Sequence, residues 1–270
     1  MVLGAMILVD TGTAAMSDKL LAAVRSISTA PIRYIVNTNE REPYSGGNDK
    51  LAPLGATVRF RPATDPRVSD GLAKDRASVI AWVSVLERMS APTGKVAARH
   101  EEAWPDDTYS NEQKKLSFND ERVLIMHEPS ATDGNSIVHF RTDDVVSVGD
   151  LIDLTSFPVI DVSAGGSIQS YLDSLQHLLD ITVTDRKSQG GTLVIPGRGR
   201  VADQAEVAYY REMLGIIRDR VQDMMKRGLT LAQIKADHPA RDYEPRYGRT
   251  TGPWTTDMFV EAVYRSLGGK

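Results

Sequence analysis

Several reactive side chains are close together in the stretch Val36–Asp49, with the sequence VNTNEREPYSGGND. It follows an apolar run and leads into a Gly-Gly turn, a place where α/β enzymes commonly present metal ligands. Glu40 and Glu42 offer carboxylates for a hard cation, Arg41 offers a guanidinium for an oxyanion, and the stretch contains neither His nor Cys. These residue types do not supply the imidazole or thiolate ligands of a typical zinc site.

Four further short segments accompany this stretch in a fixed order. They are LVDTG at 8–12, ATDGNS at 131–136, VGDL at 148–151 and IPGRG at 195–199. In order and approximate separation the five segments resemble the motifs of the metallo-β-lactamase superfamily, from Ile7 onward. The resemblance implies an α/β fold, a four-layer αββα sandwich lacking the family's first N-terminal strands. It also implies a single domain over residues 1–270, with a helical C-terminal addition over about 203–270.

The metal ligands of that family occupy known places in these motifs. They are an HxHxDH run before Gly-Gly-Asn, a third-strand His, an Asp in a Gly-Asp pair and a final His in Pro-Gly-His-Gly. The corresponding positions of this chain hold Asn39, Arg41, Pro43, Tyr44, Ala131, Asp150 and Arg198. Only Asp150 is a residue that the family uses at its position. The resemblance therefore implies that the frame of a metal site is kept while its ligands are replaced.

The replacements bear directly on zinc chemistry. A catalytic zinc ion needs about three protein ligands drawn from imidazole, carboxylate or thiolate groups. Arginine has no lone pair to offer, and Arg41 and Arg198 would add positive charge where the cation sits. We therefore expect no cofactor, with zinc only if neighbouring residues rebuild a site. The candidates for rebuilding one are Glu40, Glu42, His127, Glu128 and Asp133.

Two functions of different classes stay open. The first is a zinc-free pseudoenzyme, a scaffold or binder of a small anionic molecule, with Arg41 and Arg198 as paired guanidinium forks for a carboxylate or phosphate. The second is a hydrolase of small ester, lactone or amide (β-lactam-like) substrates that works without the usual dinuclear zinc site, with Asp150, Tyr44 and Arg41 as catalytic candidates.

A purely structural interpretation accompanies both hypotheses. A buried Asp150 needs a partner, so Arg41, Arg198 and Asp150 could form an ion pair or triad that fills the space of the lost metal. Tyr44 would then be a packed ring with a hydrogen-bonded hydroxyl rather than a proton donor.

The histidines and glycine motifs add little support for other chemistry. No Gly-x-Ser-x-Gly motif is present, so serine-hydrolase chemistry has no support, and Gly165-Gly166-Ser167 is typical of a structural helix start. We expect His127 and His139 to be structural, and His100, His177 and His238 to face solvent.

Composition excludes several partners. The 270 residues carry a net charge of -4 and no Cys, which argues against a nucleic-acid surface and excludes thiolate chemistry. No apolar run is long enough for a membrane span and no secretory signal opens the sequence, so a cytoplasmic protein is expected from the sequence as given. With strands missing ahead of Val9, an exposed sheet edge would favour a homo-oligomer.

The elements that must position these residues follow from hydrophobic periodicity, which indicates interleaved strands and helices without internal repeats. Strands are expected at 2–9, 32–37, 56–61, 123–127, 136–140, 145–148 and 192–195. Helices are expected at 17–28 with Ser17 as N-cap, and at 51–54, 75–89, 167–179, 203–226, 230–236 and 255–267. Residues 90–117 are predicted to be a polar surface excursion, and 196–199 a tight loop.

Overall fold

The computed structural model describes residues 4–56, 76–91, 98–182 and 191–269. They form an α/β structure with two β-sheets, as the sequence predicts. The chain groups into two compact units, Met1–Asp120 and Glu121–Lys270, each with its own hydrophobic cluster. The organisation into one domain stays a prediction.

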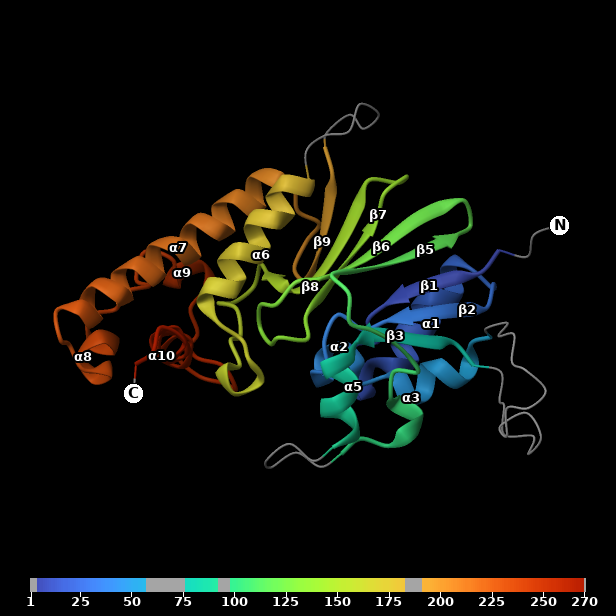
Figure 1. Ribbon diagram of the computed structural model, residues 1–270, viewed down its shortest axis with the longest axis horizontal. Coiled ribbons are helices and arrows are strands. Elements are labelled where there is room, and N and C mark those ends of the chain that lie inside the picture. The colour runs from blue at the N-terminus through green and yellow to red at the C-terminus, as the bar shows by residue number, and fades with distance from the viewer. Residues whose placement is uncertain (1–3, 57–75, 92–97, 183–190, 270) are drawn as a thin grey trace. The chain divides into compact units, whose positions relative to one another are not determined.

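The first unit is built on a parallel sheet with the strand order β1-β2-β3-β4 (Figure 1). Its strands are β1 (Met6–Val9), β2 (Ile32–Val36), β3 (Ser78–Trp82) and β4 (Asp107–Tyr109). Helix α1 (Ser17–Ile27) joins β1 to β2, which is the kind of crossover that parallel neighbours require. This strand, helix, strand beginning confirms the sequence-based expectation.

Short elements follow the carboxyl ends of these strands. They are η1 (Ala14–Met16), α2 (Glu42–Ser45), α3 (Asn48–Leu51), η2 (Ala52–Leu54), α5 (Val83–Ser90), η3 (Glu101–Ala103) and β5 (Gln113–Phe118). Burial of apolar side chains from β2, β3 and α3 forms the core beneath them, including Ile32, Ile35, Leu51 and Val79. The loops that begin at the strand ends are therefore supported by a packed hydrophobic core.

Several predictions for the first unit are wrong. The expected helix at 75–89 is a strand followed by a helix, because Ser78–Trp82 is a mostly apolar, buried run in the sheet, and such runs do not distinguish a strand from a buried helix. The described part of the expected excursion at 90–117 contains η3, β4 and β5. Ser17 is the first residue of α1 rather than its N-cap, since its hydroxyl donates to the Ala14 carbonyl. The expected strand at 56–61 lies outside the described residues, apart from Ala56.

The second unit contains an antiparallel meander, as predicted, with a parallel strand at its edge. Strands β6 (Glu121–His127), β7 (Ser136–Phe140) and β8 (Val145–Asp153) pair in antiparallel fashion, and β9 (Leu193–Arg198) pairs parallel to β8. β5, which precedes the unit boundary, is the neighbour of β6 in the sheet order. Strand β9 extends two residues past Pro196, so the predicted loop at 196–199 is confined to its end.

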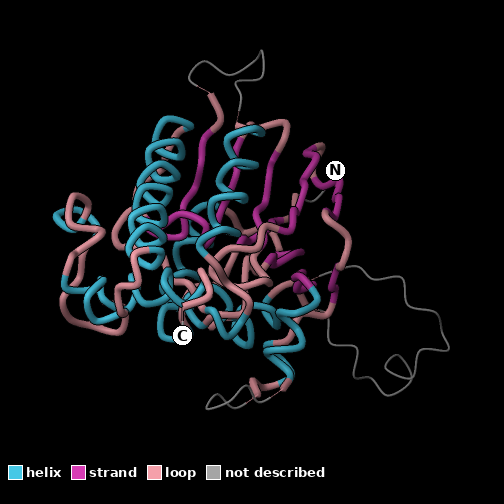
Figure 2. The backbone as a smooth tube through the Cα atoms, turned by 60° about the vertical axis from the view of Figure 1, so that its left-hand side comes forward, coloured by secondary structure: helices cyan, strands magenta, loops and turns pink. Residues whose placement is uncertain are grey.

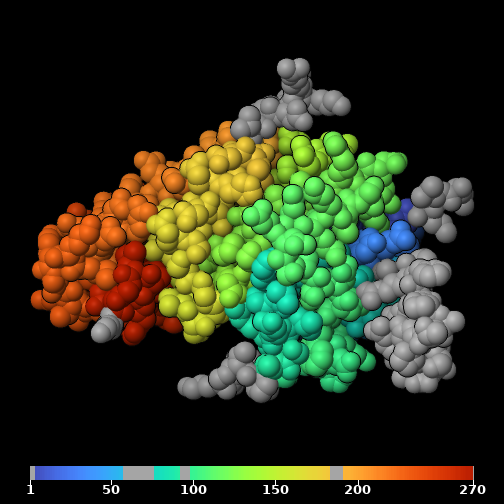
Figure 3. Space-filling model, in the orientation of Figure 1, coloured from blue at the N-terminus to red at the C-terminus, as the bar shows by residue number. Residues whose placement is uncertain are grey.

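Helices account for most of the rest of the second unit. They are η4 (Val162–Ala164), α6 (Ile168–Ile181), α7 (Gln204–Lys226), α8 (Leu231–Ala236), α9 (Glu244–Tyr247) and α10 (Thr256–Ser266). α6 and α7 run side by side (Figure 2) and form a continuous outer surface of this unit (Figure 3). The C-terminal helical addition is therefore confirmed, with the short α9 as an element that the sequence pattern did not predict.

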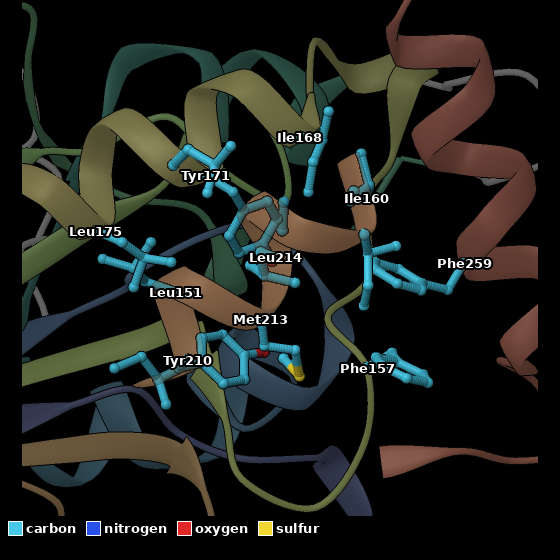
Figure 4. Close-up of a cluster of buried hydrophobic side chains, with 14 of the residues drawn as sticks. Leu151, Phe157, Ile160, Ile168, Tyr171, Leu175, Tyr210, Met213, Leu214 and Phe259 are labelled. Atoms are coloured by element: carbon cyan, nitrogen blue, oxygen red, sulfur yellow. The ribbon is translucent and has the colours of Figure 1, made fainter. Parts of the chain in front are cut away.

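The core of the second unit lies between β8 and these helices (Figure 4). Phe157 stacks on Phe259 of α10 with ring centroids 4.7 Å apart, and Tyr171 of α6 and Tyr210 of α7 are fully buried. This packing ties the helical addition to the strand that carries the Gly-Asp motif. Among the described residues, no helix has the length and apolar character needed to cross a membrane.

Candidate functional site

The loop Asn37–Asn48 of the first unit contains four of the ligand positions. Asn39 and Tyr44 are buried, while Arg41 and Pro43 are partly exposed. Arg41 precedes α2, and its backbone N–H donates to Asn39 Oδ1 at 2.9 Å. Pro43 occupies the first turn of α2, where its missing N–H costs nothing. The Asn39 oxygen is thus used to shape the loop.

A buried network of side chains holds the two ends of this loop together. Asn48 Nδ2 donates to Asn37 Oδ1 at 2.7 Å, and Asn48 Oδ1 accepts from Thr11 Oγ1 at 2.9 Å. Thr11 follows β1, so the network joins two neighbouring strand ends. The LVDTG and Gly-Gly-Asn segments therefore meet in space.

The Gly-Gly pair is needed because the backbone is tightly packed there. A Cβ on Gly46 would lie 2.6 Å from the Glu42 carbonyl oxygen, and one on Gly47 would lie 2.7 Å from the Thr11 carbonyl oxygen. Real Cβ atoms do not approach backbone oxygens so closely, so any larger residue would displace the loop. The frame of the loop has the close packing that its glycines imply.

The acidic residues in and beside the loop are engaged by other groups of the first unit. Glu40 Oε1 pairs with Arg88 at 3.3 Å, and Glu42 Oε1 accepts from the Ala14 N–H at 3.0 Å. Asp10 accepts from the Thr38 N–H at 2.7 Å. Glu40 and Glu42 thus have different partners, which does not favour their joint use as ligands for one ion.

Arg99 is a loop-binding residue that the sequence reading missed. Its Nη1 donates to Ser45 Oγ at 2.9 Å and its Nη2 donates to the Glu40 carbonyl at 2.8 Å. Burial lowers the pKa of Arg99, and the negative charges of Glu42 and Glu40 oppose that shift. No local signal could have revealed it, because Arg99 lies in a polar stretch more than fifty residues from its partners.

In the second unit, backbone atoms pack closely around Ala131. Ala131 is fully buried and its carbonyl accepts from the Asp161 N–H at 2.8 Å. A Cβ on Gly166 would lie only 2.1 Å from that carbonyl oxygen. Ser167 caps α6 by accepting from the Ser170 N–H at 3.0 Å, so Gly165-Gly166-Ser167 is a helix start as predicted.

Asp150 and Arg198 lie on neighbouring strands of the second unit. The buried Asp150 is on β8, and its carbonyl accepts from the Tyr171 hydroxyl at 3.2 Å. Arg198 faces Asp153 across β8 and β9, with Nη1 3.9 Å from Asp153 Oδ2. The predicted triad with Arg41 stays a prediction, because Arg41 belongs to the first unit and the other two residues to the second.

The turn after Arg198 has a clear backbone requirement. Gly199 has φ of +114°, and a Cβ there would lie 2.7 Å from Leu154 Cβ. Only glycine adopts this conformation readily, so the second glycine of the Pro-Gly-x-Gly motif has a structural reason to be present.

Three histidines of the second unit differ in burial and contacts. His127 Nε2 lies 2.6 Å from the Asp133 carbonyl, and burial lowers the pKa values of both His127 and His139. His177 is exposed, as expected. Its Nδ1 is also hydrogen-bonded to the buried Glu128 carboxylate, a contact that the sequence did not predict. Burial raises the pKa of Glu128, and His177 opposes that shift.

These observations test whether the family's zinc ions fit the chain. Across residues 4–56, 76–91, 98–182 and 191–269, no group of three or more His, Asp or Glu side chains could hold a metal ion. At the ligand positions, Ala131 has no donor atom and the two arginines carry no free lone pair. The residues present therefore do not fit a dinuclear zinc site.

Comparisons with known proteins agree with the fold. The family model of the metallo-beta-lactamase superfamily matches residues 4–184, and no curated protein sequence matches the chain. A metallo-beta-lactamase from Pontibacter korlensis is similar in structure, with a TM-score of 0.55 and 15% identity over 80% of this chain and 84% of the other. The DIM-1 metallo-beta-lactamase matches with a TM-score of 0.51 and 15% identity over 78% of this chain and 81% of the other.

A sulfatase resembles a longer part of the chain. The sec-alkylsulfatase Pisa1 from Pseudomonas sp. matches with a TM-score of 0.63 and 14% identity over 99% of this chain. The match takes in 46% of Pisa1, so this chain spans about half the length of that enzyme. Identities this low establish the fold and leave activity open. By the family match and by its fold, the chain belongs to the metallo-β-lactamase superfamily.

Proposed function

We propose that this protein is a zinc-free member of its superfamily that binds a small anion. In this proposal the guanidinium groups of Arg41 and Arg198 supply the positive charge that zinc supplies in a metal-dependent relative. Guanidinium groups suit carboxylate and phosphate oxygens because they offer paired N–H donors. They cannot generate a hydroxide nucleophile, so binding is favoured over hydrolysis.

One observation carries this proposal. The loop Asn37–Asn48 keeps its glycine packing and its Thr11–Asn48 hydrogen bond, while its carboxylates Glu40 and Glu42 are bonded to Arg88 and the Ala14 N–H. A loop that keeps its backbone packing without a set of metal ligands supports a purpose other than zinc binding.

Two further facts support an anionic ligand. Arg198 is about half-exposed and lies 3.9 Å from Asp153, a separation that leaves most of its N–H groups available. The similar enzyme Pisa1 is an alkylsulfatase by name, and the sulfate group of an alkyl sulfate is an oxyanion. Both facts support an oxyanion as the class of ligand.

Calorimetric titration with acetate, phosphate and sulfate tests the proposal. We expect saturable binding of at least one of these anions, unchanged by a chelator and weakened by Arg41→Ala and by Arg198→Ala. Arg122→Ala is the matched control, because this exposed arginine lies on β6 outside every motif. Binding of none of the three anions would contradict the proposal, as would binding that disappears when a chelator removes bound metal.

A metal-free hydrolase is the second candidate, and one contact favours it. The Glu128 carboxylate holds His177 Nδ1 and leaves the second nitrogen of a half-exposed ring free to act as a general base. In a screen of nitrocefin, lactones and aryl esters, this candidate predicts turnover that resists chelators and is abolished by His177→Ala. Equal turnover by His177→Ala and the wild type would exclude this residue as the base.

A further inference from the structure

Four arginines gather in the second unit where β9, α7 and α9 meet. Arg200 and Arg246 both approach the same oxygen, Glu206 Oε1, at 2.6 and 3.6 Å. Nearby, Arg198 Nη1 lies 3.9 Å from Asp153 Oδ2, and Arg249 Nη2 donates to the Thr155 carbonyl at 2.9 Å. We call Arg198, Arg200, Arg246 and Arg249 the arginine cluster.

The four guanidinium groups of the arginine cluster outnumber the carboxylates with which they form ion pairs. These ion pairs use two carboxylates, Glu206 and Asp153. Even with the buried Asp150 counted as a third, four guanidiniums leave positive charge in excess. The side chains of Arg198, Arg200 and Arg246 are 52%, 69% and 46% exposed, so their N–H groups can be reached from solvent.

Three buried polar atoms lie next to these cations. Among the described residues, the Tyr247 hydroxyl and the Oε2 atom of Glu206 have no hydrogen-bond partner, and the buried Tyr210 hydroxyl has only a poorly aligned contact with the Asp153 backbone. The two rings meet edge to face with centroids 5.9 Å apart, and Arg246 Cζ lies 5.0 Å from the Tyr247 ring centroid. Burial and the negative charge of Asp153 raise the pKa of Tyr210, and the contact with the Asp153 backbone opposes that shift.

Unpartnered buried polar atoms destabilise a fold unless a ligand or a water molecule bonds to them. Two phenols can each donate a hydrogen bond, whereas the Glu206 carboxylate can only accept one. A matching ligand must therefore accept several hydrogen bonds and also donate one. Helix α7 adds to the attraction, because Glu206 lies in the first turn of this 23-residue helix, at its positive end.

We propose that the arginine cluster, with Tyr210, Tyr247 and Glu206, binds a phosphate group that carries a proton. The guanidiniums and the phenols donate to the phosphate oxygens, and the phosphate O–H donates to Glu206 Oε2. Arg246 covers Tyr247 in the unliganded protein and is the side chain that shifts to admit the ligand. Sulfate is bound more weakly because it has no proton to offer Glu206 at neutral pH.

This site goes beyond the proposed function, since it involves neither Arg41 nor the loop of the first unit and shares only Arg198 with it. Its occupant is identified by charge and by hydrogen-bonding capacity. Inorganic phosphate is the simplest molecule of that class and serves as the probe.

Calorimetric titration of the full chain with inorganic phosphate at low ionic strength is the test. We expect one site per chain, and affinity about tenfold lower in the double variant Arg200→Ala/Arg246→Ala. Arg227→Ala is the matched control, because Arg227 follows the same helix, is similarly exposed and also pairs with a carboxylate, Asp223. Unchanged affinity in the double variant would overturn the proposal.

Two single variants separate binding from folding. Tyr247→Phe removes a hydroxyl that has no hydrogen-bond partner among the described residues, so we expect weaker phosphate binding with no loss of thermal stability. Glu206→Gln provides an amide donor, so we expect the preference for phosphate over sulfate to fall. A preference that persists in Glu206→Gln would refute the assigned role of the carboxylate.

The outcome also distinguishes this site from the proposed function. Phosphate binding that Arg41→Ala abolishes and Arg200→Ala/Arg246→Ala leaves intact would keep the proposed function and reject this site. The reverse pattern would establish this site and reject Arg41 as an anion-binding residue. Absence of binding to phosphate, sulfate and acetate would reject both.

Discussion

Replacement of Asn48 by alanine tests whether the side-chain network holds the loop Asn37–Asn48 in place. Asn48 is fully buried and takes part in four hydrogen bonds. Its amide donates to Asn37 Oδ1 at 2.7 Å and to the Ala103 carbonyl at 2.9 Å, and its oxygen accepts from Thr11 Oγ1 and Asn37 Nδ2. Alanine removes all four bonds and leaves the partner groups buried.

The expected cost follows from the groups left unpaired. Thr11 Oγ1 also lies 3.2 Å from the Tyr44 carbonyl, so it keeps a weaker acceptor. The Asn37 amide and the Ala103 carbonyl lose their short partners, and each buried unpaired group costs about 1–3 kcal/mol. We therefore expect Asn48→Ala to lower the free energy of unfolding by about 3–5 kcal/mol.

Urea unfolding followed by circular dichroism measures this loss, and hydrogen exchange shows where it occurs. We expect faster amide exchange across residues 37–48 and unchanged exchange in the second unit. Asn111→Ala is the control, because Asn111 is exposed and should change the free energy of unfolding by less than about 0.5 kcal/mol. A loss below about 1 kcal/mol for Asn48→Ala would refute the network as the support of the loop.

Three further perturbations test other parts of the structure. Gly47→Ala would place a Cβ 2.7 Å from the Thr11 carbonyl oxygen, so we expect a loss of about 1–3 kcal/mol in urea unfolding, with Gly4→Ala, which meets nothing within 4 Å, as a neutral control. Arg99→Met removes the bonds to Ser45 and Glu40, so we expect about 2 kcal/mol lower stability and faster hydrogen exchange in the loop, and equal exchange would contradict this role. Burial lowers the pKa of His139 below 6.5, so the unfolded chain binds the proton more readily and stability falls as the pH drops below about 6.5. His139→Gln should reduce that loss between pH 7.5 and 5.5, and an unchanged pH dependence would count against the buried His139.

Long amphipathic elements could be predicted well from the sequence. Helix α7 begins where Asp203 accepts the Glu206 N–H, one residue after the predicted start, and Thr230 forms a capping box with Gln233 at α8. Strand β3 could not be predicted, because Ser78–Trp82 is buried on both faces and its partners β2 and β4 are distant in the sequence. Local periodicity identifies half-buried elements and fails for fully buried ones.

The residues of the candidate site also differ in whether a local sequence pattern predicts them. The motif order identified the loop Asn37–Asn48 and the Arg198 position, because short segments carry their own backbone requirements. Arg99 and the pairing of Glu128 with His177 depend on contacts between distant segments, which no local pattern encodes. The buried hydroxyl of Tyr210 could not be predicted for another reason, since the spacing of this residue on α7 indicated only a core position.

Metal content tests the central claim most directly. Elemental analysis of the protein purified without chelator, before and after incubation with zinc, compares the wild type with a variant that restores the family's ligands. That variant combines Asn39→His, Arg41→His, Pro43→Asp, Tyr44→His, Ala131→His and Arg198→His. We expect far less than one zinc ion per wild-type chain and stoichiometric zinc in the restored variant. Stoichiometric zinc in the wild type would contradict the claim that the frame has lost its metal.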